Sequence, residues 1–300
     1  MNIPDDYRCG LVAVIGRPNV GKSTLINAVM GRKVSIVTAK PQTTRHRILA
    51  VLTEAKQQII FVDTPGLHRK SAKAMNRLMN RTAANALADA DLILFVSDAT
   101  RWTSEDDDVV KRLKSCNSPV IALLNKIDKV HPREKLLDGL ALMSARLDFA
   151  EIVPISALKD DNLDHLMAMI PAFLPESPPL FPEDMQTDRS DEFHVAEIIR
   201  EKLTLRLHQE MPYGLTVQVE RMVKEEKGIA INAIIWVERD SQKGIAVGKN
   251  GSVLKMVGRS ARLEIAELLG QPVHLELWVK VKTNWADNAT DLMNLGYEAP

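Results

Sequence analysis

The chain has 300 residues, of which 45% are hydrophobic and 26% charged, and its formal net charge at pH 7 is zero. This length favours two domains, because single hydrophobic cores seldom grow much beyond ~200 residues. A zero net charge excludes binding to nucleic acid through a global field, so any such binding must use a local basic patch.

The cysteines and the N-terminus indicate the compartment. Cys9 and Cys116 have no metal-binding or redox spacing, which predicts free thiols in a reducing environment. Residues 1–8 are polar, and no uninterrupted apolar run approaches the ~20 residues of a membrane span. We therefore expect a cytoplasmic protein.

A phosphate-binding loop follows the first apolar run, residues 11–15, and leads into a predicted helix. Its two glycines are four residues apart and are followed at once by Lys-Ser, the pattern G-x-x-x-x-G-K-[ST]. Glycines let successive backbone N–H groups face one anion, and the new helix adds its positive dipole end. Lys22 can reach the β- and γ-phosphates of a nucleotide, and the Ser23 hydroxyl can bind Mg2+. The predicted nucleotide contacts of the loop are Gly16, Arg17, Pro18, Asn19, Val20, Gly21, Lys22, Ser23 and Thr24.

Asn19 has two interpretations. Its carboxamide oxygen can help to hold a monovalent cation such as K+ beside the phosphates, as a substitute for an arginine finger, or the side chain only caps the loop. The sequence does not decide between them, and we assign no other catalytic residue.

A polar, basic segment with several hydroxyls, residues 38–47, lies between two apolar segments. Behind a phosphate loop, such a segment predicts a switch whose threonine binds Mg2+ when a γ-phosphate is present. We expect Thr44 to be that ligand, with Thr43 as the alternative.

A strand pair is predicted at residues 48–53 and 58–62, and its second strand ends in Asp-Thr-Pro-Gly. Asp63 can hold Mg2+ through water, and a glycine N–H can approach a γ-phosphate because no side chain is in the way. Leu67 stands where small signalling GTPases often have a water-orienting glutamine, so we expect slow turnover. The predicted contacts here are Asp63, Thr64, Pro65 and Gly66, and the predicted metal ligands are Ser23, Thr44 and Asp63.

The next buried strand, residues 119–124, ends in Asn-Lys-Ile-Asp. Asp128 can accept from the N1–H and 2-amino groups of guanine, which adenine does not offer side by side, so it selects guanine. Lys126 can lie along the base, and Asn125 can tie the loops together. After a strand at residues 151–155, Ser156 and Ala157 supply a backbone N–H for the guanine carbonyl oxygen. The other predicted elements of this half are helices at residues 76–90, 105–113 and 163–173 and a strand at 91–97.

These five elements, in this order, resemble the translation-factor-like GTPases over residues 8–174. Strands alternate with helices, which predicts an α/β domain whose mostly parallel sheet is covered on both faces. Five of the fifteen prolines lie between Pro171 and Pro182, which predicts a stiff linker.

The remaining chain predicts a smaller α+β domain. Its expected elements are a helix at residues 191–210, a hairpin at 215–223 and 229–237, a G-x-x-G loop at 248–251, a helix at 252–269 and a strand at 273–281. This order resembles a type II KH domain, whose loop clamps about four nucleotides of single-stranded nucleic acid. Residues 241–263 carry five basic side chains and no acidic one. The predicted RNA contacts are Lys243, Ile245, Val247, Gly248, Lys249, Asn250, Gly251, Lys255 and Arg259, with an apolar groove around Ile245 and Val247. Trp278 alternates within the last strand, and we expect it in the core.

Together the motifs resemble the Era-like bacterial ribosome-assembly GTPases with a C-terminal KH domain. The expected division is a GTPase domain at residues 1–174, a linker at 175–190, a KH domain at 191–283 and a tail at 284–300. The resemblance implies Mg2+-dependent hydrolysis of GTP to GDP and phosphate, and binding of 16S rRNA near its 3′ end. It also implies a role in 30S subunit assembly and maturation, and a peripheral fraction at the inner membrane. We expect a monomer that does not bind DNA.

Two alternatives compete with this interpretation. One is a signalling GTPase whose second domain binds protein, against which Leu67 and the basic patch argue. The other is an ATP-driven enzyme, against which Asp128 argues. For the favoured interpretation we expect GTP and Mg2+ to order residues 38–47 and 63–70 and thereby to gate RNA binding.

Overall fold

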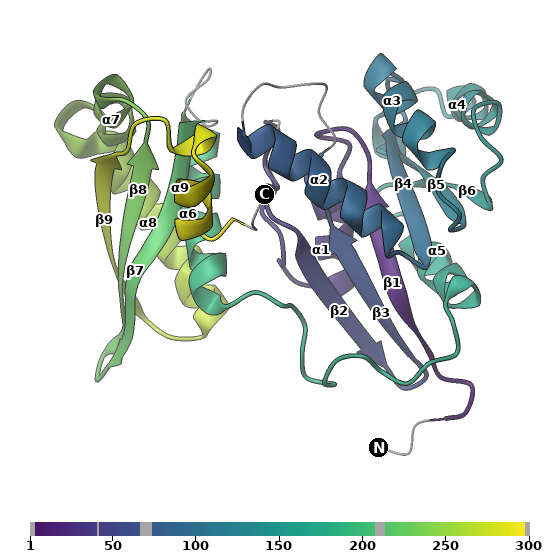
Figure 1. The fold of residues 1–300 in the computed structure, drawn as a ribbon, viewed down its shortest axis with the longest axis horizontal. Coiled ribbons are helices and arrows are strands. Elements are labelled where there is room, and N and C mark those ends of the chain that lie inside the picture. The colour runs from purple at the N-terminus through teal and green to yellow at the C-terminus, as the bar shows by residue number, and fades with distance from the viewer. Residues whose placement is uncertain (1–3, 41, 67–73, 208–213, 298–300) are drawn as a thin grey trace. The chain divides into compact units, whose positions relative to one another are not determined.

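The computed structural model describes residues 4–40, 42–66, 74–207 and 214–297 (Figure 1). The described residues divide into two compact units. The first unit holds the residues up to Asp188 apart from 74–78, and the second holds 74–78 and the residues from Arg189 onward.

Within the described residues, the first unit is built on a six-stranded sheet in the order β2-β3-β1-β4-β5-β6. Every neighbouring pair is parallel except β2 and β3, so the predicted mostly parallel α/β sheet is confirmed. The central strands are long apolar runs because helices bury both of their faces. The strands are β1 (Arg8–Ile15), β2 (Ile48–Glu54), β3 (Gln57–Asp63), β4 (Leu92–Asp98), β5 (Val120–Asn125) and β6 (Glu151–Ile155).

Helices cover the two faces of this sheet. One face packs against α2, α3 and α4 through a core that includes Phe95, Val109 and Met143, and α1 lies on the opposite face (Figure 1). Helix α4 was not predicted, although Leu136, Leu140 and Met143 recur at helical spacing and pack on the core. The helices are α1 (Lys22–Met30), α2 (Ala74–Ala88), α3 (Ser104–Leu113), α4 (Lys135–Ser144) and α5 (Leu163–Met169).

The proline-rich segment 175–188, which we call the strap, lies along the first unit's sheet. The fully buried Gln58 on β3 accepts hydrogen bonds from the backbone N–H groups of Leu180 (2.8 Å) and Phe181 (2.9 Å). The same amide donates to the carbonyl of Phe181 at 2.8 Å. Further along, Thr187 pairs with Ala50 on β2, the edge strand. The expected linker is therefore held against the sheet as far as residue 188, and the predicted domain limits remain a prediction.

The described part of the second unit has a three-stranded sheet in the order β7-β8-β9. Strands β7 and β8 are antiparallel, whereas β8 and β9 are parallel. Helices α6, α7 and α8 share one core with this sheet, which includes Val195, Ala246, Val257 and Ile235. The strands are β7 (Leu215–Glu225), β8 (Gly228–Val237) and β9 (Val273–Val281), and the helices are α6 (Asp191–Arg206), α7 (Asp240–Val247), α8 (Ser252–Leu269) and α9 (Ala289–Asn294).

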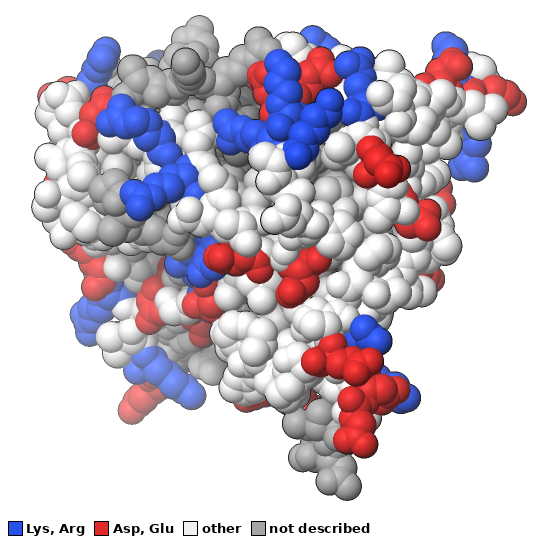
Figure 2. Space-filling view, turned by 45° about the vertical axis from the view of Figure 1, so that its right-hand side comes forward, with Lys and Arg blue, Asp and Glu red and all other residues white. Residues whose placement is uncertain are grey.

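The surface carries both signs of charge. Figure 2 shows Lys and Arg close to Asp and Glu over much of the visible face, with uncharged areas between them. No single-sign field covers that face, which agrees with the net charge of zero. Among the helices that the structure describes, none is long and apolar enough to cross a membrane.

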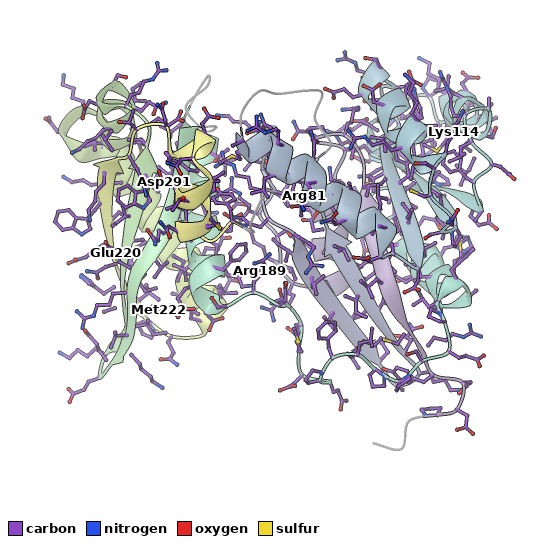
Figure 3. The ribbon with its side chains drawn as sticks, in the orientation of Figure 1. Arg81, Lys114, Arg189, Glu220, Met222 and Asp291 are labelled. Carbon is purple, nitrogen blue, oxygen red and sulfur yellow. The ribbon has the colours of Figure 1, made fainter. Side chains whose placement is uncertain are left out.

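The prediction that Trp278 lies in the core is wrong. Its side chain is 57% exposed, because Leu277 and Val279 on either side turn into the core and leave Trp278 on the opposite face of the sheet. Lys280 lies on that outward face and contacts Glu220, whose side chain points away from the helices (Figure 3). Trp285, whose burial was not predicted, is fully buried and donates to the carbonyl of Gly214 at 3.3 Å.

Candidate functional site: a nucleotide cavity and a basic groove

A cavity of about 560 Å³ lies in the first unit, where the phosphate loop meets the segment 36–44. In open parallel sheets, ligands bind beyond the carboxyl ends of the strands, and β1, β3 and β5 all end in loops that carry predicted site residues. The predicted residues that line the cavity are Pro18, Asn19, Gly21, Lys22, Ser23, Thr24, Thr43, Thr44, Gly66 and Lys126.

The phosphate loop holds its lysine inside the cavity wall. The Lys22 ammonium donates to the carbonyls of Gly16 and Arg17, both at 3.0 Å. Burial lowers the pKa of Lys22 to about 8, against the opposing effect of the Asp63 carboxylate. Gly21 has a φ of 105°, and a Cβ there would lie 2.3 Å from the Asn125 amide, so only glycine fits.

Three oxygens of the predicted metal ligands meet in one place. The Ser23 hydroxyl lies 2.9 Å from the Thr44 hydroxyl and donates to Asp63 Oδ2 at 2.9 Å. Asp63 is fully buried, which raises its pKa, and its Oδ1 has no hydrogen-bond partner among the residues that the structure describes. Hydroxyl and carboxylate oxygens are hard donors, which Mg2+ prefers, and Asp63 Oδ1 remains available to accept from the ion's shell. These three residues therefore fit a Mg2+ site.

The two candidate threonines lie in different surroundings. Whereas Thr44 joins the other predicted ligands, the Thr43 hydroxyl lies 2.6 Å from the Thr38 hydroxyl and donates to the carbonyl of Lys40 at 2.7 Å. The geometry therefore favours Thr44 as the metal ligand.

Next to Lys126, which lines the cavity, Asn125 ties three loops together without lining the cavity itself. Its amide donates to the carbonyl of Val20 at 2.8 Å and accepts from the backbone N–H of Ala157 at 3.0 Å. Next to it, the Ser156 hydroxyl donates to Asp128 Oδ1 at 2.6 Å, which fixes the orientation of the carboxylate expected to select guanine. These partners lie on β5, the phosphate loop and the loop after β6, as the sequence pattern requires.

Asn19 links the phosphate loop to the switch segment. Its amide donates to the carbonyl of Ala39 at 2.8 Å, while its own backbone carbonyl accepts from the Lys126 ammonium at 2.6 Å. The structure thus adds a bridging contact that neither interpretation of Asn19 included. Both interpretations, the cation ligand and the loop cap, stay predictions.

Ten predicted nucleotide contacts are not lining residues of the cavity, namely Gly16, Arg17, Val20, Asp63, Thr64, Pro65, Asn125, Asp128, Ser156 and Ala157. Thr64 donates to the carbonyl of Val14 at 3.0 Å, and Arg17 donates to Asp106 on α3 at 2.9 Å. Val20 is fully buried, and Pro65 is not a lining residue. Leu67 lies outside the described residues.

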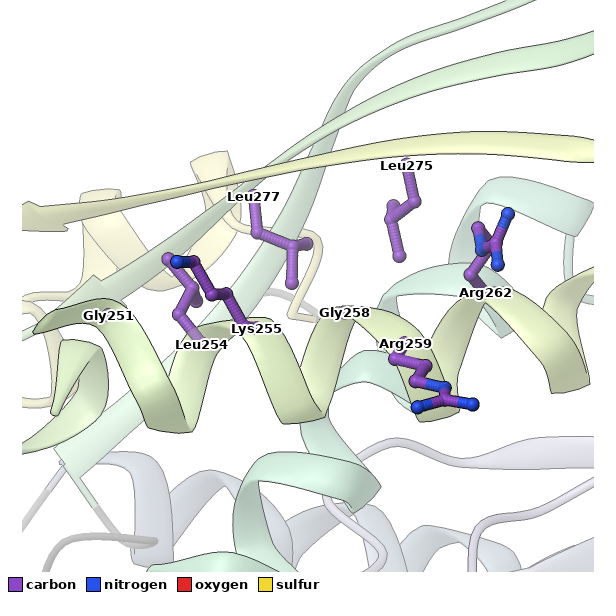
Figure 4. A pocket seen from close by; sticks show the side chains of 8 residues that line it. All are labelled: Gly251, Leu254, Lys255, Gly258, Arg259, Arg262, Leu275 and Leu277. Carbon is purple, nitrogen blue, oxygen red and sulfur yellow. The ribbon is translucent and has the colours of Figure 1, made fainter.

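A second hollow, the groove between α8 and β9 in the second unit, has a volume of about 390 Å³ (Figure 4). Lys255, Arg259 and Arg262 come from α8, while Leu275 and Leu277 project from β9 toward that helix. Of the predicted RNA contacts, Gly251, Lys255 and Arg259 line it. The others, Lys243, Ile245, Val247, Gly248, Lys249 and Asn250, do not.

The G-x-x-G loop closes one end of this groove. Gly248 has a φ of 73°, and a Cβ there would lie 2.5 Å from the Val253 side chain, so a larger residue would force the loop open. The apolar lining differs from the expected one. Ile245 is 52% exposed and Val247 packs against the core, whereas Leu254, Leu275 and Leu277 line the groove.

Comparison with known proteins identifies two domain families in this chain. Residues 11–126 match the family described as 50S ribosome-binding GTPase, and residues 210–286 match the KH domain family. GTPase Era of Marinobacter nauticus is 48% identical over 291 residues, which cover 97% of this chain and 95% of the relative. GTPase Era of Vibrio parahaemolyticus is 47% identical over 296 residues, which cover 98% and 92%. The chain belongs to the Era family of GTPases.

Solved Era structures share the fold over nearly the whole chain. One is Era in complex with MgGDPNP and nucleotides 1506–1542 of 16S ribosomal RNA, with a TM-score of 0.94, 41% identity and coverage of 98% of this chain and 100% of that one. An Aquifex aeolicus Era variant bound to GDP·AlF4⁻ gives the same values. The predicted fold class, a GTPase domain followed by a KH domain, is confirmed.

Sequence reasoning missed several residues of the two sites. Leu158, 68% exposed, and Lys129 line the nucleotide cavity, and each directly follows a motif residue that was predicted. Arg262 lines the groove one helical turn after Arg259. A helical spacing of three to four residues from Lys255 would have included it. Leu275 and Leu277 could have been found from the alternation of β9, once its buried face was known.

Proposed function

We propose that this protein is a Mg2+-dependent GTPase that binds 16S rRNA near its 3′ end and acts in assembly and maturation of the 30S ribosomal subunit. One observation carries the proposal. A single cavity is lined by Lys22, Ser23, Thr44 and Lys126, and the same chain has a separate basic groove. Beside the cavity, Ser23 donates to the buried Asp63, and Asp128 follows Lys126 by two residues. Its membership of the Era family and the relative solved with MgGDPNP and 16S rRNA support it.

In the free protein, hydrogen bonds within the phosphate loop hold the groups that are proposed to bind the phosphates of GTP. Lys22 exchanges its bonds to two loop carbonyls for bonds to phosphate oxygens, and the backbone N–H groups of the glycine-bounded loop face the same anion. Ser23, Thr44 and Asp63 would hold Mg2+, which when bound neutralises phosphate charge. Asp128 accepts hydrogen bonds from guanine, with Ser156 fixing its orientation.

Hydrolysis of GTP to GDP and phosphate is expected to be slow, because Leu67, which lies outside the described residues, stands where small signalling GTPases often have a water-orienting glutamine. We propose that a K+ ion held with the help of Asn19 would accelerate hydrolysis. The hydrogen bond from the Asn19 carboxamide to the carbonyl of Ala39 joins the phosphate loop to the switch segment, which supports this role. Turnover that is equal in K+ and Na+ would refute this part of the proposal.

RNA binding is proposed for the groove between α8 and β9. Three basic side chains on α8 can contact the phosphates of a single strand, while Leu254, Leu275 and Leu277 offer an apolar surface to the bases. Few aromatic residues lie there, so recognition depends on backbone clamping by Gly248–Gly251 and on base-edge hydrogen bonds.

The remaining proposals concern organisation. We propose the domain limits 1–174, 175–190, 191–283 and 284–300, with the strap as the part of the linker that is bound to the sheet. GTP and Mg2+ are proposed to order residues 38–47 and 63–70 and thereby to gate RNA binding. Of these residues, 41 and 67–70 lie outside the described part. We propose a monomer in the cytoplasm that binds no DNA and has a peripheral fraction at the inner membrane, which flotation with lipid vesicles would test.

RNA binding by the protein loaded with GDP or with a non-hydrolysable GTP analogue tests the function. The ligands are the 3′ end of 16S rRNA and a scrambled RNA of equal length. Tight binding of the first RNA only, and only with the analogue, is expected. Equal weak binding of both RNAs would favour a guanine-specific GTPase whose second domain binds protein. Asp128→Asn should shift selectivity from guanine toward xanthine nucleotides, and unchanged selectivity would refute the guanine assignment.

A further inference from the structure

The phosphate loop is fastened from the side by the start of helix α3. Arg17 Nε donates to Asp106 Oδ2 at 2.9 Å, and Arg17 Nη2 donates to the backbone carbonyl of Arg101 at 3.1 Å. The Asp106 side chain is fully buried, and that of Arg17 is 13% exposed. This ion pair is therefore largely shielded from water. Charged hydrogen bonds are stronger in such a buried site than at the protein surface.

Asp106 is itself held in a fixed position. The same carboxylate oxygen accepts from the backbone N–H of Thr103 at 2.8 Å and from the Thr103 hydroxyl at 2.9 Å. The bond from the Thr103 N–H is one half of the N-terminal capping box of α3, whose other half runs from the Asp106 backbone N–H to the Thr103 side chain. An anionic side chain in the first turn is further stabilised by the helix dipole. Arg17 is thus bound to a rigid group that belongs to another element of the fold.

The connection continues from Arg17 to the phosphate-binding lysine. The carbonyl of Arg17, together with that of Gly16, accepts from the Lys22 ammonium in the free protein. The guanidinium and the carbonyl group belong to the same residue, Arg17. A guanidinium held by Asp106 therefore also limits rotation of the backbone in the first turn of the loop. The guanidinium points to Asp106 and is not a lining group of the nucleotide cavity.

We propose that Asp106 is a positioning residue for nucleotide binding, which acts by holding Arg17 and thereby the first turn of the phosphate loop. The proposal rests on the nucleotide-binding function proposed above. A glycine-bounded loop that is already ordered loses less conformational freedom when a phosphate binds, so the pair increases affinity without touching the ligand. Arg17 then serves the nucleotide through its backbone, and its guanidinium serves the loop.

The test is a double-mutant cycle on the dissociation constant and dissociation rate of a fluorescent GDP. Asp106→Asn keeps an acceptor for Thr103 but removes the charge, and should weaken GDP binding about fivefold. Arg17→Ala should weaken it about tenfold. Because both changes remove one interaction, the double variant should also be about tenfold weaker than wild type, and not about fiftyfold. At saturating GTP, the kcat of Asp106→Asn should stay within about twofold of the wild-type value while its KM rises.

Asp107→Asn is the matched control. Asp107 lies on the same helical turn but accepts from Trp102 Nε1 at 3.0 Å and from Arg146 at 2.9 Å. The Asp107→Asn variant should bind GDP with an affinity within about twofold of wild type. Its unfolding in urea measures any loss of stability caused by the change in α3. Equal effects of Asp106→Asn and Asp107→Asn, or additive effects of Arg17→Ala and Asp106→Asn, would overturn the proposal. An Arg17→Ala effect much larger for GTP than for GDP would also overturn it, since that would show direct phosphate contact. Failure of the wild-type protein to bind GDP would instead overturn the proposed function.

Discussion

Gln58 should decide whether the strap stays bound to the first unit. Gln58→Leu preserves an apolar stem of similar size but removes the amide that serves the N–H of Leu180, the N–H of Phe181 and the carbonyl of Phe181. At a net value of ~1 kcal/mol for each hydrogen bond, the loss is about 3 kcal/mol. Leu180 is 56% exposed, so water can reach the freed groups, which keeps the loss from rising to the full cost of buried, unpaired groups.

Hydrogen exchange of the Leu180 and Phe181 amides, combined with urea unfolding of the first unit, measures this effect. We expect both amides to exchange about a hundredfold faster or more in the variant, as a loss of about 3 kcal/mol in local stability requires. Gln57→Leu is the control, because the Gln57 amide donates to the exposed Glu54 carboxylate on β2 at 2.7 Å. If Gln58→Leu stays within about 0.5 kcal/mol of wild type and both amides exchange as before, the reasoning about the strap is wrong.

Three further predictions concern the two sites. Thr44→Ala should raise the Mg2+ concentration needed for GTP binding about tenfold and Thr43→Ala by less than about threefold, and a Mg2+ titration that shows the reverse order would move the metal ligand to Thr43. Because the pKa of Lys22 in the free protein is about 8 and bound phosphate favours its charged form, binding takes up a proton above that pH. GDP affinity measured by calorimetry should then fall by up to about tenfold per pH unit above this pKa and be flat below it, and a flat profile throughout would contradict the assignment. At Gly258 a Cβ would lie 3.6 Å from Leu277, so Gly258→Ala should keep RNA binding. Gly258→Leu should fill the groove and weaken RNA binding more than about tenfold, with GTP hydrolysis unchanged. Equal RNA affinity of the two variants would exclude the groove as the RNA site.

The local patterns in the sequence were sufficient for most of the fold. Strand β6, strand β9 and helix α8 have the predicted limits, because each is a periodic segment with clear boundary residues. Helix α4 was missed although Leu136, Leu140 and Met143 recur at helical spacing and pack on the core, so the pattern was present in the sequence. The phosphate loop and the guanine-selecting motif were predicted from spacing alone because their chemistry depends on residues that are close in the chain.

Contacts between distant segments could not be predicted in this way. Strand alternation shows that β9 has two faces but not which one is buried, and this is why Trp278 was placed wrongly. Nothing within residues 43–44 distinguishes the two threonines, whereas folding brings only Thr44 to Ser23. The Arg17–Asp106 pair joins residues 89 positions apart. The sequence by itself determined the order of elements and the chemistry of the motifs, because both are written in short-range spacing. Only the tertiary structure decided which of several suitable side chains meet, because that depends on how strands and helices far apart in the chain pack together.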